Sequence, residues 1–515
     1  MHPVLQNKEL LLEIVEYLEY EPRSLISIAT TCQDFSGPAC SVIWRNCEWF
    51  GPFVEFLPQN KYVLEDSDRF SPPILISDLT HEDVARIRYY ASFVKRLSLK
   101  RYYPGINELV LGAILSALHA QHFFPNLQIL RYEGPTEFAP HLASLIGPFV
   151  FEVNLVYEFR NSGIYPGLAP SSHEFLIEMD FWVALKERQS NTIRRFTIHT
   201  NEPSPDRMYQ LLAGWDTLEN LAINADIGFP TAEAIAALPR LSKLRIFLRG
   251  KLDKPPHRSF PANVSLQQLE LEGESPSQTF EDYLAILRPT SLTHLIIIIF
   301  GGTQGADLRH LCERVRENCS TDSLDRLELS LPSTQDEPMA FHDIQSLLSF
   351  TNLVYVGLFY ASYGLKDDDI AHLAQSWPRL RQLTLRHSSG RSNEIPTCTL
   401  NSILAFAQHC RDLETLVMAV DATTVIMPNR ADIAFQRAHT CLRTFEVLHS
   451  PIVAPVEVAS FLTRFFPTLK PEGLVTPELV QDERREQLWE WTRCLIPVML
   501  DARRTGIHGD HDEET

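Results

Sequence analysis

A short pattern of apolar residues, apolar-x-x-apolar-x-apolar, recurs along most of this sequence and constrains its fold more than any other feature. Faint copies begin at Val94, Leu127 and Val150, and clearer ones follow. The clearer copies begin at Ile193, Leu218, Leu241, Leu266, Leu292, Leu324, Leu353, Leu380, Leu413 and Leu442. Most starts lie about 23 to 33 residues apart, and such a series indicates stacked copies of one structural unit.

The spacing within each copy has a physical meaning. Its last two apolar positions alternate as in a β-strand with one buried face, and its first closes the turn before that strand. Helices fit between the copies: Thr231 can cap a helix that carries Ile235 and Leu238 and that Pro239 ends. One such unit cannot bury its apolar face alone, so its neighbours must stack on it. The sequence therefore predicts an α/β array with parallel strands on the concave side and helices on the convex side.

Two stretches carry a family resemblance, GLKDDDIAHLAQSWPRLRQLTL (364–385) and ILAFAQHCRDLETLVM (403–418). They resemble leucine-rich repeats of the class found beside F-boxes, and the resemblance extends over roughly residues 91 to 450. The family has Asn or Cys five residues after the middle apolar position, where it joins each turn to the next. Four copies differ there and carry Asp226, Glu274, Ser388 and Asp421. We therefore expect an irregular solenoid that breaks across the long gap from Leu155 to Ile193.

The first 50 residues show a different pattern. Helices are expected at residues 8–20, 23–32 and 38–47. On a helical wheel, the apolar residues of the first helix cover an arc of about 160°, whereas one core needs about 100°. These residues are Leu10, Leu11, Ile14, Val15, Tyr17 and Leu18. A segment this small is also close to the lower size limit for independent stability, so the excess apolar surface predicts a binding partner.

This segment resembles an F-box of the kind found in many fungal proteins, through ELLLEI (9–14), SLISIATTCQDF (24–35) and IWR (43–45). Gln6-Asn7 replaces the Leu-Pro pair usual at the start of the motif. An F-box binds the Skp-type adaptor of a cullin-based SCF ubiquitin ligase, and the attached repeats recruit a substrate protein. The resemblance implies that nine residues form the adaptor-binding face or the small core beneath it, with the last of them closing the third helix. They are Leu10, Leu11, Ile14, Leu18, Leu25, Ile28, Cys32, Phe35 and Trp44.

These patterns predict four parts along the chain. They are an F-box-like helical domain (1–50), a linker (51–90), a leucine-rich repeat domain (91–470), and a C-terminal capping helix with an acidic tail (471–515). In the capping helix, Leu488, Trp491 and Leu495 are expected to share the buried face. A plain helical cap on the array is the alternative interpretation of residues 1–50, because terminal repeats need capping.

Charge and cysteine content narrow the possible partners and compartments. Lys and Arg number 46 and Asp and Glu number 65, which gives 46 − 65 = −19, a charge that repels nucleic acid and anionic membranes. No apolar stretch approaches the roughly 20 residues of a membrane span. The nine cysteines contain no CxxC pair, which favours a reducing compartment, cytoplasmic or nuclear.

No recognised catalytic motif is present: the sequence lacks HExxH, GxSxG and the phosphate-binding glycine motifs. No catalytic residue, cofactor or metal site is therefore expected, and an enzyme built on the array is the least favoured hypothesis. The first hypothesis is the substrate-recognition subunit of an SCF-type cullin ubiquitin ligase. The alternative is a leucine-rich repeat scaffold for protein–protein interaction with no ubiquitin-ligase role.

Overall fold

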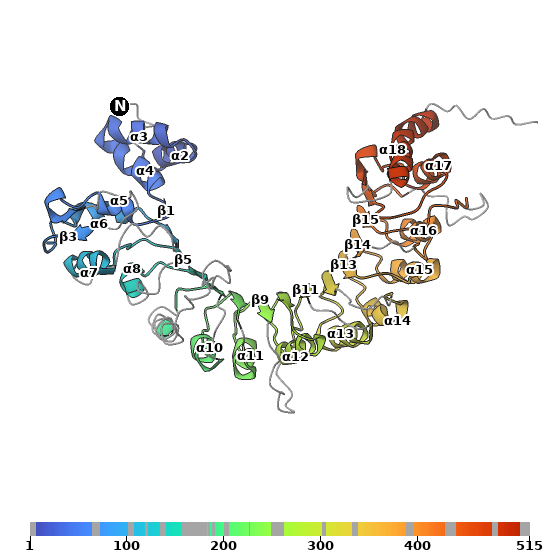
Figure 1. Ribbon diagram of the computed structural model, residues 1–515, viewed down its shortest axis with the longest axis horizontal. Coiled ribbons are helices and arrows are strands. Elements are labelled where there is room, and N and C mark those ends of the chain that lie inside the picture. The colour runs from blue at the N-terminus through green and yellow to red at the C-terminus, as the bar shows by residue number, and fades with distance from the viewer. Residues whose placement is uncertain are drawn as a thin grey trace, which may run out of the picture. The chain divides into compact units, whose positions relative to one another are not determined.

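The computed structural model divides into two compact units, Met1–Leu241 (unit 1) and Ser242–Thr515 (unit 2). In each unit, strands and helices alternate along the chain (Figure 1). The described residues are 7–63, 73–100, 108–118, 122–133, 141–156, 183, 186–187, 191–199, 205–225, 227–248, 262–300, 305–331, 338–387, 395–427, 439–475 and 483–504.

Three helices open unit 1, as the sequence predicted. They are α2 (Lys8–Glu16), α3 (Pro22–Thr31) and α4 (Gln33–Ile43). The third starts five residues earlier than predicted, because Cys32 is extended (φ −160°, ψ 165°) and separates α3 from α4, while Pro38 is accommodated within α4. Asn7, which departs from the F-box pattern, caps α2: its side-chain Oδ1 accepts a hydrogen bond from the Glu9 backbone N–H at 3.0 Å. Gln6 lies outside the described residues.

One parallel sheet runs through the described part of unit 1, with strands in the order β1, β4, β5, β6, β7, β8. The strands are β1 (Asn46–Cys47), β4 (Arg96–Lys100), β5 (Ile129–Glu133), β6 (Glu152–Val156), β7 (Arg195–His199) and β8 (Asn220–Asn224). The faint copies that begin at Val94, Leu127 and Val150 thus form β4, β5 and β6, and these three residues are fully buried. Strand β1 was not predicted.

The predicted break between Leu155 and Ile193 is wrong. Strand β6 pairs directly with β7, with Glu152 opposite Arg195 and Leu155 opposite Ile198. The sheet therefore continues from the copy before the long gap to the copy after it. The residues in between lie largely outside the described residues.

Residues 51–90 are more structured than the linker we expected. Their elements are α5 (Gly51–Val54), η1 (Gln59–Lys61), β2 (Tyr62–Val63), β3 (Ile74–Leu75) and α6 (Ala85–Ala91), and β2 and β3 pair antiparallel. Phe53 and Ile87 are buried, and the Phe53 ring packs edge-on against Phe123 at 5.6 Å between centroids. These apolar side chains fold the stretch onto the first repeats, because exposing them would cost free energy.

In unit 2, strands β9 to β17 are parallel, and each lies next to the strand that follows it in the chain. The strands are β9 (Lys243–Leu248), β10 (Gln268–Gly273), β11 (His294–Ile299), β12 (Arg326–Leu331), β13 (Tyr355–Tyr360), β14 (Gln382–His387), β15 (Thr415–Val417), β16 (Thr444–Glu446) and β17 (Leu474–Val475). Together, β4 to β16 supply one strand for each copy of the sequence pattern. The short terminal strand β17, like β1, has no copy of its own.

The same backbone contact joins successive repeats in both units. One carbonyl at the entry to a strand accepts hydrogen bonds from two consecutive N–H groups of the next repeat, and we term this contact the shared carbonyl. The Gln267 carbonyl, for example, accepts from Thr293 at 2.8 Å and from His294 at 3.0 Å. The acceptors are Arg45, Lys95, Gln128, Phe151 and Arg194 in unit 1, and Ser242, Gln267, Thr293, Asp325, Val354, Arg381 and Glu414 in unit 2. Because only backbone atoms take part, the contact does not need the Asn of the family pattern.

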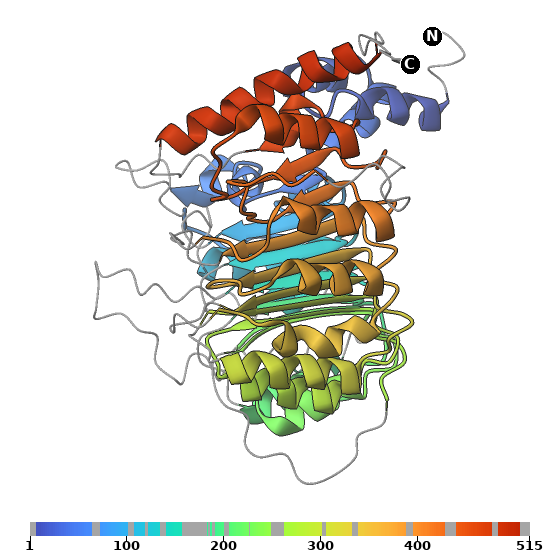
Figure 2. The same cartoon turned by 90° about the vertical axis from the view of Figure 1, so that its right-hand side faces the viewer.

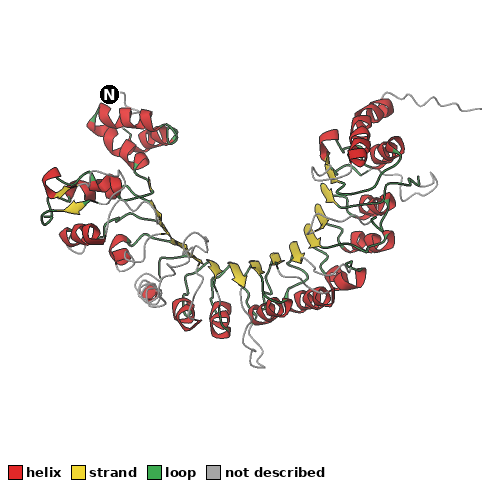
Figure 3. Ribbon diagram, in the orientation of Figure 1, coloured by secondary structure: helices red, strands yellow, loops and turns green. Residues whose placement is uncertain are grey.

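Helices connect the strands. They are α7 (Glu108–Ala117), α8 (Leu142–Leu145), α10 (Pro205–Leu212) and α11 (Phe229–Ala236) in unit 1, and α12 (Ser277–Leu287), α13 (Gly305–Asn318), α14 (Phe341–Ile344), η3 (Gln345–Ser349), α15 (Asp367–Ser376), α16 (Leu400–His409), α17 (Pro455–Phe465), η5 (Pro471–Gly473) and α18 (Glu483–Arg504) in unit 2. Within each unit, the strands line the inner, concave side and the helices the outer side (Figure 3). Thr231 does not cap α11 as predicted, because Gly228 precedes the helix and Thr231 is buried in its first turn. Asp226 and Ser388 lie outside the described residues.

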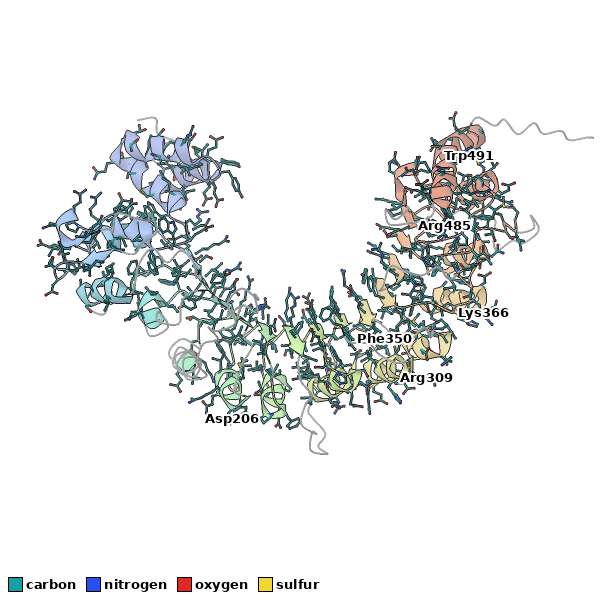
Figure 4. All side chains as sticks on the ribbon, viewed as in Figure 1. Asp206, Arg309, Phe350, Lys366, Arg485 and Trp491 are labelled. Carbon is teal, nitrogen blue, oxygen red and sulfur yellow. The ribbon has the colours of Figure 1, made fainter. Side chains whose placement is uncertain are left out.

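The C-terminal helix α18 buries a different face from the predicted one. Figure 2 shows α17 and α18 packed side by side at the end of unit 2. The buried residues of α18 are Trp489, Thr492 and Ile496, rather than the predicted Leu488, Trp491 and Leu495. The indole N–H of Trp489 donates to the Ser450 carbonyl at 2.9 Å, and this buried hydrogen bond favours the observed face. Trp491 is 56% exposed, and Figure 4 marks its place on α18. Residues 505–515 of the predicted acidic tail lie outside the described residues.

Gly273, the last residue of β10, lies very close to the end of β9. Its φ is +154°, and a Cβ atom there would stand 1.9 Å from the Leu248 carbonyl oxygen. Any larger residue must therefore push the ends of the two strands apart, at a point where the Gly273 carbonyl also accepts a hydrogen bond from the Phe300 N–H.

Gly273→Ala is expected to destabilise unit 2 by about 2 kcal/mol or more, because it places a methyl group against a neighbouring backbone. The thermal midpoint, followed by far-UV circular dichroism, should fall by at least about 4 °C. Glu274→Ala is the control, because the Glu274 side chain is exposed. An equal effect of the two substitutions would contradict this packing.

Candidate functional site

The three N-terminal helices enclose a small core of their own. Its buried members are Leu11, Val15, Leu25, Ala39 and Val42. Helices α2 and α3 both pack on α4, so each of the three helices contributes to this core. The segment therefore has its own hydrophobic core, and several apolar residues outside this core remain exposed.

The nine predicted adaptor-binding residues fall into different environments. Leu11 and Leu25 lie in the core, and Leu18, Ile28 and Phe35 are half-buried against it. Cys32 is half-buried at the junction of α3 and α4. Leu10 and Ile14 are exposed, at 40% and 44%. Trp44 is the C-cap residue of α4. The predicted set therefore combines core and surface residues.

An apolar stripe remains uncovered on α2. It consists of Leu10 and Ile14, together with Tyr17, the C-cap residue of the helix, which is 89% exposed. At about 100° per residue, these three residues span about 60° of the wheel. Leu18, Leu11 and Val15 span a second arc of about 60°, which begins about 40° further on and faces the core. The wide arc seen in the sequence is thus divided between a buried half and an exposed half.

The predicted set omitted three exposed apolar side chains of this segment. They are Tyr17, Tyr20 and Ile26, which are 89%, 92% and 55% exposed. The spacing of Leu10, Ile14 and Tyr17, at i, i+4 and i+7, is a signal in the sequence that places Tyr17 beside the other two on one helix face. No comparable periodic signal identifies Tyr20, which lies beyond the end of α2, or Ile26, which lies on α3.

Trp44 packs into the junction between the three helices and the elements that follow them. Its ring lies 5.3 Å from Phe53, 5.6 Å from Phe56 and 5.2 Å from Tyr90, measured between centroids. The Phe56 and Tyr90 rings stack on each other at 4.5 Å. Arg45, the next residue, forms an ion pair with Glu16 of α2. Trp44 and Arg45 therefore fix α4 to its surroundings on two sides.

A small pocket in unit 2 lies between the ends of β14 and β15 and the loops beside them. Its lining includes Tyr363, His387, Cys398, Met418 and His449. Its volume of about 30 Å³ holds one or two water molecules, far less than a substrate or cofactor occupies. Burial raises the pKa of the Cys398 thiol to about 12, so this thiol is protonated and a poor nucleophile at neutral pH.

Two histidines of this pocket contact each other. The rings of His387 and His449 lie 4.4 Å apart and nearly perpendicular, and His387 Nδ1 lies 2.7 Å from the Ala361 carbonyl oxygen. Burial, together with the neighbouring His387 and Arg485, lowers the pKa of His449 to about 4. His449 is therefore neutral in the folded chain, and its carbonyl accepts a hydrogen bond from Arg485 of α18 at 2.9 Å.

The described residues include neither a metal-binding cluster nor a membrane-spanning helix. Within them, no three His, Cys, Asp or Glu side chains gather in a way that would hold a metal ion. Their helices include none that is both long and apolar enough to cross a bilayer.

No family model and no curated protein matches this sequence. Several solved structures are similar to the chain. The leucine-rich repeat-containing protein LegL7 from Legionella pneumophila is 16% identical, covering 64% of this chain and 97% of its own, with a TM-score of 0.33. An internalin, InlF, from Listeria monocytogenes is 9% identical. The match covers 77% of this chain and 89% of the internalin, with a TM-score of 0.34. The structure of the complex of Rad7 and Elc1 in yeast is 13% identical to this chain. The match covers 79% of this chain and 78% of the other, with a TM-score of 0.34. These TM-scores are low, and the leucine-rich repeat architecture of each unit rests on its own strand register and alternating helices.

Leu25→Ala should destabilise the three-helix segment by about 2 to 4 kcal/mol, because it leaves a cavity in a small core. Leu10→Ala should cost less than about 1 kcal/mol, because Leu10 is partly exposed. Amide hydrogen exchange over residues 8–43 of the full chain measures both effects. Equal loss of protection in the two variants would contradict the division into core and stripe.

His449 makes the stability of unit 2 depend on pH. Its folded pKa of about 4 is lower than the roughly 6.5 of an unfolded histidine, so below about pH 6.5 only the unfolded chain gains this proton. Stability therefore falls with pH between about 6.5 and about 4, with about 2 kcal/mol lost by pH 5. His449→Gln removes this contribution, so its thermal midpoint should fall less than the wild-type midpoint between pH 7.5 and pH 5. Equal falls would refute the assignment.

Proposed function

We propose that this chain is the substrate-recognition subunit of an SCF-type cullin ubiquitin ligase. Its three N-terminal helices act as an F-box that docks a Skp-type adaptor, and through the adaptor a cullin. Its repeats bind a target protein that has yet to be identified. The chain itself is not an enzyme in this proposal, because ubiquitin transfer is carried out by other subunits.

The apolar stripe on α2 is the observation that carries the adaptor half of the proposal. Leu10, Ile14 and Tyr17 lie beside a core that is already complete beneath them. Burying a large apolar side chain contributes about 1.5 to 3 kcal/mol, so an uncovered row of three is a strong site for a partner helix or groove. Ile26 of α3 and Tyr20 add further exposed apolar surface to the same small segment.

The attachment of the helices suits a receptor that must hold its target in a defined place. Trp44 packs among three aromatic rings, and β1, directly after α4, pairs with β4 of the first repeat. The backbone N–H groups of Lys95 and Arg96 both donate to the Arg45 carbonyl at 2.9 Å. A flexible tether would lack these contacts, so the orientation of the helices on the first repeats is constrained.

The target half of the proposal rests on the open face of the strands. Parallel strands present every second side chain on the side away from the helices, which gives rows of solvent-facing residues. Such faces are the usual binding surfaces of repeat proteins. A scaffold with no ubiquitin-ligase role would use the same face, so adaptor binding is the property that separates the two functions.

Leu10→Asp combined with Ile14→Asp should weaken binding to a purified Skp-type adaptor by at least about 100-fold, because two charges would enter an apolar contact. Isothermal titration with the full chain measures the affinity. Both side chains are exposed, so the fold should be retained. Leu11 is unsuitable for this test, because a charge in the core would unfold the segment.

Glu9→Gln combined with Glu13→Gln is the matched control, since both residues are exposed on the same helix. This pair should bind the adaptor within about twofold of the wild-type chain. Absence of adaptor binding by the wild-type chain, or equal binding by the Asp pair, would favour a scaffold without a ligase role.

A further inference from the structure

We term one surface of unit 2 the β9–β13 face. It consists of the positions of five neighbouring strands that lie on the side away from the helices, with one residue that follows β11. In strand order, the residues at these positions are Lys243, Arg245 and Phe247; Gln268, Glu270 and Glu272; His294, Ile296, Ile298 and the following Phe300; Arg326, Glu328 and Ser330; and Tyr355, Gly357 and Phe359. Figure 4 shows side chains standing out from the strands on the side away from the helices. This face contains acidic, basic, aromatic and aliphatic groups in one register.

The carboxylates of this face are only partly neutralised. Arg245 serves two of them: its Nη2 lies 2.8 Å from Glu272 Oε1 and its Nε lies 3.5 Å from Glu270 Oε1. Glu328 accepts a hydrogen bond from the Tyr355 hydroxyl at 3.1 Å, and within the described residues it forms no ion pair with a basic side chain. Burial and the neighbouring Glu272 and Glu328 raise the pKa of Glu270 to about 7, against the opposing effect of Arg245. An additional cation would relieve this repulsion.

The register places Glu270 and Glu328 on the two strands that flank β11. Glu270 lies opposite Ile296 on β11, and Ile296 lies opposite Glu328 on β12. Neighbouring strands are about 4.8 Å apart, so the backbones that carry the two carboxylates are separated by about 10 Å across an isoleucine. A side chain that lies over Ile296 is therefore within reach of both carboxylates.

Aromatic side chains lie on the strands to both sides of this pair of carboxylates. Phe247 stacks on Phe300 with 5.9 Å between ring centroids, and Phe300 is 53% exposed. On the other side, Tyr355 and Phe359 lie close over Gly357, where a Cβ atom would stand 3.0 Å from the Tyr355 hydroxyl and 3.1 Å from the Phe359 ring. Exposed apolar groups with polar residues around them mark sites of protein–protein interaction.

The face already holds two arginines of this chain, in two different ways. The guanidinium carbon of Arg326 lies 4.1 Å from the centroid of the Tyr355 ring, and Arg245 bridges two carboxylates. A planar guanidinium can stack and form paired hydrogen bonds at once, whereas the ammonium of lysine is only a point charge. Arginine therefore matches the chemistry of this face better than lysine does.

We propose that the β9–β13 face binds a protein segment through an arginine that enters between Glu270 and Glu328, while apolar neighbours of that arginine pack on the aromatic side chains. The inference rests on the target-binding half of the proposed function and specifies the target as a segment with arginine flanked by apolar residues. An anionic ligand would be repelled by the same carboxylates.

Fluorescein-labelled peptides with a central leucine–X–leucine sequence test this inference on the full chain by fluorescence anisotropy. X is arginine, the neutral isostere citrulline, or glutamate. The arginine peptide should bind at least about tenfold more tightly than the other two. Its affinity should fall by a similar factor in the Glu270→Gln/Glu328→Gln variant and should weaken as salt rises from about 0.05 M to about 0.5 M. Glu272 is kept, because it holds Arg245.

Glu313→Gln/Glu317→Gln is the matched control, because both carboxylates are exposed on α13, away from the strand face. This variant should bind the arginine peptide as the wild-type chain does. No binding of the arginine peptide, equal binding of the citrulline peptide, or undiminished binding by Glu270→Gln/Glu328→Gln would overturn the inference. Adaptor titration of the same preparations keeps the two proposals separate: failure of wild-type adaptor binding counts against the ligase role alone, and failure of peptide binding counts against the β9–β13 face alone.

Discussion

The shared carbonyl is the contact on which the repeat arrangement depends. Two consecutive N–H groups converge on one oxygen of the preceding repeat at 2.7 to 3.3 Å, and the arrangement recurs in both units. Since it uses backbone atoms alone, it sets the strand register whatever side chains stand nearby. A repeat can then be long or short between its strands without disturbing the sheet. Arg194 and Arg195 show this, because they donate to the Phe151 carbonyl across the longest gap in the repeat series.

A register that does not depend on side chains has a consequence for recognition. The side chains between the buried positions of each strand take no part in the shared carbonyl contact. They can therefore vary to suit a binding partner. In the middle row of the β9–β13 face, Arg245, Glu270, Ile296 and Glu328 stand side by side because their strands pair in register.

The N-terminal helices expose their apolar surface for a different reason. There, a single helix, α2, supplies both a core and an exposed stripe, because its apolar arc is about 160° wide, whereas one core requires about 100°.

The fold could be read largely from the sequence, because its main pattern has a direct physical cause. In a strand with one buried face, every second residue is buried, so apolar and other residues alternate in the sequence. Every copy of the pattern formed such a strand. Strands β1 and β17 could not be found in this way: each has two residues, and each exists because it extends an edge that the repeats leave open. The buried face of α18 was also beyond the pattern. Two faces of that helix are apolar, and the choice between Trp489 and Trp491 depends on the Ser450 carbonyl, which lies 39 residues earlier in the chain.

The two candidate sites, the apolar stripe on α2 and the β9–β13 face, were harder to predict from the sequence than the fold. The reason differs between the two sites. The wheel of α2 contained the stripe, but it could not divide the arc into its buried and exposed halves, because that division depends on where α3 and α4 pack. For the β9–β13 face, aligning the copies already places Glu270, Ile296 and Glu328 at equivalent positions. What the alignment lacks is the lateral pairing of side chains: that Arg245 is occupied by Glu270 and Glu272, and that Arg326 stacks on Tyr355. Two surfaces with equal numbers of acidic and basic side chains can differ, because in one every carboxylate forms an ion pair and in the other a carboxylate such as that of Glu328 forms none with the described residues. The side-chain contacts distinguish the two.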